Sequence, residues 1–175
     1  MPKEIDVSYH PEKIDPSVHV AQGAVVIGDV TIGKDTSIWY NSVLRGDMDR
    51  IVVGERCNIQ DCAVVHTDWD APTTIGNDVT VGHGAVIHGA TVEDEVLVAV
   101  GAIILNWAHI GRNSIIGAGA VIPERRVIPP NSVVAGVPGQ VIGTVDEKRL
   151  KYIQRFVGDY LRLKEAYGDN HRIDE

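Results

Sequence analysis

Three of the seven histidines lie close together in the sequence, as His66, His83 and His88. Three imidazoles form the ligand set of catalytic zinc sites, which leave a fourth position open to water, whereas structural zinc usually takes four protein ligands. Zinc held in this way lowers the pKa of a bound water to about 7, so hydroxide becomes available at neutral pH. The competing interpretation is three unrelated surface histidines, and spacing alone leaves both open.

The elements that must position these histidines repeat every six residues. An aliphatic residue recurs at this interval from Val20, Val26 and Ile32 onward and, after interruptions, up to Val134. A period of six fits neither a helix, at about 3.6, nor a plain strand, at about 2, but is typical of a hexapeptide β-helix, in which three hexads form one coil. The sequence therefore predicts an all-β fold, with a parallel β-helix over residues 14–142.

A different pattern follows Ile142, where apolar residues recur at helical spacing. We expect one amphipathic C-terminal α-helix over residues 145–168, with Asp146 near its start and Gly168 at its end. Its main expected role is to pack along the β-helix and cover an exposed edge. Both parts are expected to form a single domain over residues 1–175.

The six-residue frame is interrupted three times. The irregular steps run from Leu44 to Val53, from Val65 to Ile75 and from Ile87 to Val92. They surround the segment Arg45-Gly46-Asp47 and the residues His66 and His88. Because local irregularity is common where function is installed, these interruptions mark a candidate site.

The frame also predicts where the three histidines point. His66 and His88 each directly follow a frame residue and are separated by three hexad steps, which make one full coil. We therefore expect their imidazoles to stack on one face, about 4.8 Å apart, where they could share a metal. His83 lies around a corner, up to roughly 16 Å from His88, so a neighbouring subunit of a homotrimer is expected to supply it, which gives three equivalent sites.

Composition excludes several classes of partner. The net charge is −8 and no basic run is present, so we expect no nucleic acid partner. The sequence begins with charged residues and contains no apolar stretch of 18 residues, so we expect neither a signal peptide nor a membrane span. We therefore expect a cytoplasmic protein. Cys57 and Cys62 are expected to be reduced and structural. We assign no role to the remaining histidines, His10, His19, His109 and His171.

Several motifs together resemble the gamma-class carbonic anhydrase family, whose fold is a left-handed parallel β-helix of hexapeptide repeats. They lie in the segments LRGDMDRIVVGERCNIQDCAVVHT and TIGNDVTVGHGAVIHGA, and the resemblance extends over about residues 14 to 165. Hexads alone are weak evidence, because many acyltransferases share them. The combination of R-G-D, N-x-Q-D, a histidine five residues later and G-H-x4-H-G is specific.

The resemblance implies hydration of carbon dioxide to bicarbonate, with a metal-bound hydroxide as the nucleophile. It implies that His66, His83 and His88 bind zinc, or iron or cobalt in its place, across the interfaces of a homotrimer. It further implies roles for Arg45 and Asp47 near the metal, Asp61 in ion pairing between subunits, Gln60 as a hydrogen-bond partner of the metal-bound water, and Tyr160 in the pocket.

Two departures from the family pattern concern proton transfer. Active members carry a glutamate where this chain has Met48, and a second glutamate in a long acidic loop that shrinks here to residues 67–72. Asp68 or Asp70 would have to substitute, or buffer must carry the proton. We therefore expect a slow carbonic anhydrase.

Two other functions remain open. A hexapeptide acyltransferase or coenzyme A thioesterase would use a catalytic histidine without metal, and its activity would survive chelation. A non-catalytic metal-binding scaffold would keep the fold and the metal ligands. In that case, substitution of Gln60 would leave carbon dioxide hydration unchanged.

Overall fold

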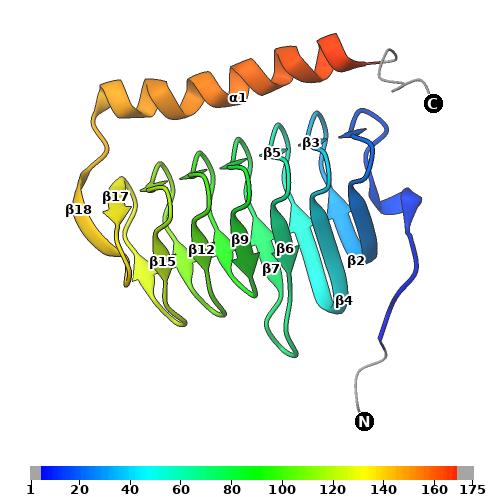
Figure 1. The fold of residues 1–175 in the computed structure, drawn as a ribbon, viewed down its shortest axis with the longest axis horizontal. Helices are drawn as coiled ribbons and strands as arrows, with labels where there is room; N and C mark the ends of the chain where they lie inside the picture. The colour runs from blue at the N-terminus through cyan, green and yellow to red at the C-terminus, as the bar shows by residue number, and fades with distance from the viewer. Residues whose placement is uncertain (1–4, 169–175) are drawn as a thin grey trace.

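A computed structural model describes residues 5–168 of the protein. Short strands wind around one axis as a parallel β-helix, and the C-terminal helix α1 lies along its whole length (Figure 1). The predicted fold is thereby confirmed. Helix α1 extends over Glu147–Tyr167, just inside the expected range, while the expectation of a single domain stays a prediction.

The strands line three faces of the β-helix, joined at three edges. The first face contains β4 (Val43–Val53), β6 (Val64–His66), β9 (Val86–His88), β12 (Ile103–Ile104) and β15 (Val121–Ile122), with β2 (Val25–Ile32) beside β4. The long strand β4 continues into the second face, which adds β7 (Thr73–Ile75), β10 (Thr91–Val92), β13 (His109–Ile110) and β16 (Val127–Ile128).

The third face has its own sheet. It contains β1 (His19–Val20), β3 (Ser37–Ile38), β5 (Asn58–Ile59), β8 (Thr80–Val81), β11 (Leu97–Val98), β14 (Ile115–Ile116) and β17 (Ser132–Ala135), and β18 (Gln140–Thr144) pairs antiparallel with β17. A short 3₁₀ helix, η1 (Pro11–Lys13), precedes the first coil.

The hexad residues fill the interior. Frame residues such as Ile38, Leu44, Ile59 and Ile87 have no exposed side-chain surface and stack from coil to coil in one core cluster. Parallel pairing of successive coils supplies backbone hydrogen bonds to each short strand. The hexad pattern therefore sets the register in which neighbouring site residues align.

Helix α1 packs along the β-helix, as the sequence predicts, and lies on the third face, where it contacts β3 and β8. The Asp146 side chain caps its first turn by accepting from the Arg149 N–H at 2.8 Å. Ile153 and Val157 are the buried residues of the helix, and the ring of Tyr160 packs edge-on against buried Trp39, with centroids 5.3 Å apart. Neither this helix nor any other in residues 5–168 combines the length and apolar character that a membrane span requires.

Candidate metal site

His66 and His88 lie side by side at the ends of β6 and β9, where the two residues are register partners. The Nδ1 atom of His66 is 3.0 Å from the Nε2 atom of His88, and the ring centroids are 4.9 Å apart. The hexad phase predicts this arrangement from one full coil of spacing. Their role as metal ligands stays a prediction.

Asp47 determines which ring nitrogen of His66 carries the proton. The Nε2 atom of His66 is 3.1 Å from Asp47 Oδ1, and because an ionised carboxylate can only accept, the Nε2–H of His66 donates. The second oxygen of Asp47 accepts from Arg45, whose backbone is the register partner of His66. Burial raises the pKa of Asp47, but the hydrogen bonds from His66 and Arg45 outweigh it, so the pKa lies below its ordinary value. The pKa of His66 is lowered, chiefly by burial.

Asn106 determines which ring nitrogen of His88 carries the proton. Its Oδ1 atom bonds to Nδ1 of His88, while its Nδ2 donates to Asp68 Oδ2 at 3.1 Å. Since the amide group facing Asp68 must be the donor, the atom facing His88 is the acceptor, and His88 carries its proton on Nδ1.

The two imidazole nitrogens that face each other therefore both present lone pairs. A guanidinium nitrogen of Arg45 lies 3.5 Å from His66 Nδ1, at the outer limit of a hydrogen bond. Two ligand nitrogens at about 2.0–2.1 Å from one tetrahedral ion lie about 3.3 Å apart, close to the 3.0 Å seen here. The donor atoms thus fit a shared cation.

His83 lies at the opposite edge of the first face, between β8 and β9. Its Nδ1 atom is 2.8 Å from Asp61 Oδ2, and Gln60 beside Asp61 is 4% exposed and donates to Asn58 Oδ1 at 3.0 Å. Burial, with a smaller contribution from the charge of Asp61, raises the pKa of Tyr160 to about 12. This edge therefore gathers the other four predicted site residues.

The predicted residues thus separate into two groups on two edges of one face. We call Arg45, Asp47, His66 and His88 the first half-site, and Gln60, Asp61, His83 and Tyr160 the second half-site. Within residues 5–168, no three His, Cys, Asp or Glu side chains come together as a metal-binding cluster. One chain therefore offers two imidazoles at one edge and the third at the other.

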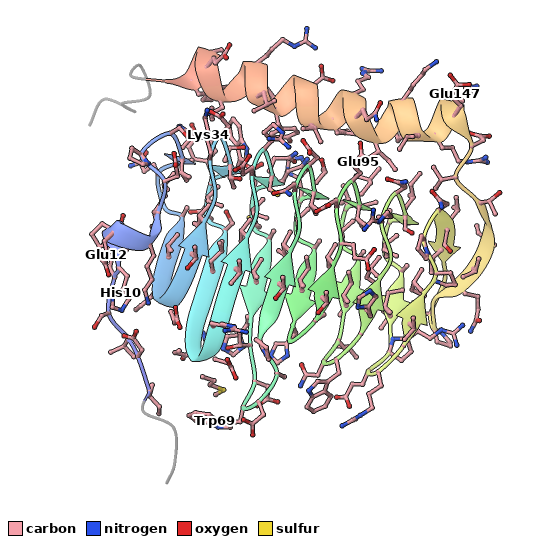
Figure 2. The ribbon with its side chains drawn as sticks, turned by 180° about the vertical axis from the view of Figure 1, so that it is seen from behind. His10, Glu12, Lys34, Trp69, Glu95 and Glu147 are labelled. Atoms are coloured by element: carbon pink, nitrogen blue, oxygen red, sulfur yellow. The ribbon has the colours of Figure 1, made fainter. Side chains whose placement is uncertain are left out.

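Sequence reasoning missed Asn106 and Asn58, which orient the polar groups of the two half-sites. A signal exists for Asn106, because it follows His88 by 18 residues, or one regular coil. Figure 2 shows His10 and Glu12 on the segment before the first coil, and Trp69 at the tip of the loop that carries Asp68. His171 lies outside the described residues.

The chain is similar to known proteins both in sequence and in structure. The family model described as bacterial transferase hexapeptide (six repeats) matches residues 89–124. A protein of Methanocaldococcus jannaschii named "Probable carbonic anhydrase" is 52% identical over 153 residues, which are 87% of this chain and 96% of the relative.

Two further matches extend over most of the chain. Gamma carbonic anhydrase 2, mitochondrial, of Arabidopsis thaliana is 39% identical over 90% of this chain, which spans 59% of that longer protein. The crystal structure of a hexapeptide transferase family protein from Anaplasma phagocytophilum is 37% identical, covers 88% of this chain and 91% of its own, and superposes with a TM-score of 0.84. On identity that extends over nearly the whole chain, the protein belongs to the gamma-class carbonic anhydrase family.

Proposed function

We propose that the protein hydrates carbon dioxide to bicarbonate at a metal ion held between the subunits of a homotrimer. The observation that carries the proposal is the pair of lone-pair nitrogens, on His66 and His88, that face each other at 3.0 Å. Each ring is held in that state by an oxygen acceptor on its far side. Such acceptors behind metal-binding histidines fix the ring orientation and raise ligand basicity.

Zinc is the ion that we assign, with iron or cobalt able to replace it, because imidazole suits these borderline metals. His66 and His88 of one subunit and His83 of the next would hold it. The ion would lower the pKa of a water molecule, so that hydroxide is available near neutral pH to attack carbon dioxide.

Gln60 is suited to orient the attacking oxygen. Asn58 donates from Nδ2 to the Thr80 hydroxyl at 2.8 Å, so its Oδ1 is the atom that accepts from Gln60 Nε2. The orientation of the Gln60 amide is thereby fixed, and its Oε1 is left to accept a hydrogen bond from the reacting water. Burial of Gln60 excludes competing solvent from this amide.

The first face offers a surface on which a second copy can pack. Its outward positions form one row of β-branched residues in continuous register, Val25, Val43, Val64, Val86, Ile103 and Val121. All six side chains are at least partly exposed. In contrast, α1 covers the third face, and the second face carries polar residues such as Thr74, Thr91 and His109 in the corresponding row.

The row of β-branched residues runs between the two half-sites. An exposed apolar patch of this kind marks an interaction surface. Contacts between unlike edges close into a ring when the rotation between copies is one third of a turn. In such a ring the first half-site of each copy meets the second half-site of the next, which completes three sites.

Subunit complementation tests the proposal. His66→Ala and His83→Ala each remove one ligand from every site of their own trimers, so both are expected to be inactive. In a mixed trimer, one junction joins an intact first half-site to an intact second half-site. An equal mixture refolded together should therefore recover about a quarter of the wild-type activity and metal content.

The matched control mixes His66→Ala with His88→Ala. Both substitutions lie in the first half-site, so every site in the mixture lacks a ligand and no recovery is expected. Failure of the His66→Ala and His83→Ala mixture to recover either activity or metal would overturn the shared-site proposal.

The other two functions give different results in simple assays. Acyl transfer or thioester hydrolysis by a metal-free histidine would persist after chelation, whereas carbon dioxide hydration is expected to stop and to return with added zinc. A scaffold would bind metal without turnover. Gln60→Ala should lower hydration while metal content stays unchanged, and hydration unaffected by this change would remove the main support for catalysis in this region.

A further inference from the structure

Asp68 lies in the short loop after β6, and both of its carboxylate oxygens accept hydrogen bonds. Its Oδ1 accepts from the backbone N–H of Trp69 at 2.8 Å, and its Oδ2 accepts from Asn106 Nδ2 at 3.1 Å. Asn106 is 7% exposed and lies one coil further along, between β12 and β13. The loop thus places a carboxylate behind the amide that faces His88.

A carboxylate at this place decides which way the amide points. An asparagine side chain has one accepting end and one donating end, while an ionised carboxylate only accepts. Asp68 therefore attracts Nδ2 and leaves Oδ1 for Nδ1 of His88. With the amide reversed, Nδ2 would donate to His88 Nδ1, and the ring proton would move to Nε2, where it would block the atom that faces His66.

The local backbone leaves room for this arrangement and holds it. Gly89 has a positive φ of 58°, and a Cβ atom there would lie 2.6 Å from Asn106 Oδ1. The backbone carbonyl oxygen of Asn106 accepts a hydrogen bond from the backbone N–H of Arg125 at 2.9 Å. Any larger residue at Gly89 would push the amide away from His88.

We propose that Asp68 and Asn106 are positioning residues that hold His88 in the Nδ1–H tautomer, so that its Nε2 lone pair is free for a metal. This inference rests on the proposed function, in which His88 is a ligand. It gives the short loop a role other than proton transfer, because both oxygens of Asp68 are already hydrogen-bonded.

The tautomer can be read directly in the metal-free, full-length protein. Long-range ¹H–¹⁵N spectra of the protein in mildly alkaline buffer distinguish Nδ1–H from Nε2–H, and we expect Nδ1–H for His88. In Asp68→Asn, either end of the new amide can face Asn106, so the Nε2–H form should appear. Metal affinity, measured by competition with a chelator, should fall about tenfold or more.

A swapped pair provides the rescue. Asn106→Asp alone places two carboxylates in contact, and their repulsion should displace the one that faces His88 and so also weaken metal binding. When Asp68→Asn is combined with Asn106→Asp, the carboxylate and the amide exchange places. The exchanged carboxylate would accept both from His88 and from the exchanged amide, so His88 again donates from Nδ1. We expect the double variant to recover the Nδ1–H tautomer and most of the affinity, whereas a merely structural defect would not be repaired. Asp70→Asn, in the same loop, is the control and should change neither measurement.

The outcomes separate the inference from the function on which it rests. An unchanged His88 tautomer in Asp68→Asn, or a swapped pair no better than Asp68→Asn alone, would overturn the inference. A wild-type protein that binds no metal, yet shows the tautomer shift in Asp68→Asn, would uphold the inference and refute the proposed function.

Discussion

His66 Nδ1 and His88 Nε2 face each other at 3.0 Å across adjacent coils, and each ring has its proton committed to an oxygen on its other side. Two lone pairs at this distance repel each other in the absence of a cation. Regular stacking of one coil on the next is what forces the two rings together. The β-helix therefore holds in advance two nitrogens at a spacing that suits the proposed shared metal.

Metal binding should stabilise the fold. A ligand at 100 times its dissociation constant adds about 2.7 kcal/mol to the free energy of unfolding when only the folded protein binds it. We expect zinc to raise the Tm of the stripped protein and His88→Gln to abolish that increase. His109→Gln is the control, because His109 bonds to Glu93 on the second face, and a zinc-dependent increase lost equally in both variants would contradict the assignment of His88.

A charge in the apolar row should separate the subunits. Val64→Asp places a carboxylate in the middle of the proposed interface, where desolvation costs several kcal/mol, so we expect a monomer by analytical ultracentrifugation that has lost its metal. Thr74→Asp makes the same charge change on the exposed centre of β7, on the second face, and should leave the trimer intact. A Val64→Asp protein that stays trimeric would place the interface on another surface.

Proton export should limit turnover. Met48 stands in β4 directly after Asp47 and lines a cavity of about 310 Å³ with it, but a thioether cannot transfer protons. We expect turnover of the fully metallated enzyme to rise with buffer concentration. Met48→Glu should raise turnover at low buffer severalfold by supplying an acid–base group, and the benefit should vanish at high buffer. Turnover independent of buffer concentration would show that another step limits the reaction.

The sequence predicts the fold because each hexad places one aliphatic residue in the core. The position of each residue that follows Leu44, Val65 or Ile87 is then fixed relative to the core residue before it. For this reason the pairing of His66 with His88 follows from counting alone. The separation of His83 follows in the same way, since it lies on the opposite edge. Regular repeats convert sequence distance into spatial distance.

The hydrogen-bond partners are harder to predict. Asn106 belongs to the column of His88, but its contact with Asp68 depends on how the short loop folds back, through a bridge between Asp68 and Ala71. Likewise, Asn58 looks like an ordinary outward strand residue, yet it is buried and hydrogen-bonded to both Gln60 and Thr80. Irregular loops and contacts with the helix do not follow the six-residue frame, so their partners become visible only in the structure.

One ion pair should tie the end of α1 to the first coils. Lys164 is 13% exposed at its side chain and donates to Asp35 Oδ1 at 2.8 Å and to the Ser17 carbonyl at 3.2 Å. We expect Lys164→Met to lower the free energy of unfolding by about 1 kcal/mol at neutral pH. Lys151→Met, which removes a pair with Glu147 on the exposed side of the helix, should have a smaller effect.

The effect of Lys164 should also depend on pH. The hydrogen bond from Lys164 lowers the pKa of Asp35, so the pair stabilises the fold fully above the unfolded-state value of about 3.9 and loses this contribution as pH falls through the folded-state value. Urea unfolding at fixed protein concentration should therefore show wild type and Lys164→Met converging in acid. An equal difference at neutral and acid pH would mean that Lys164 stabilises the helix through packing of its aliphatic chain rather than through the charge of Asp35.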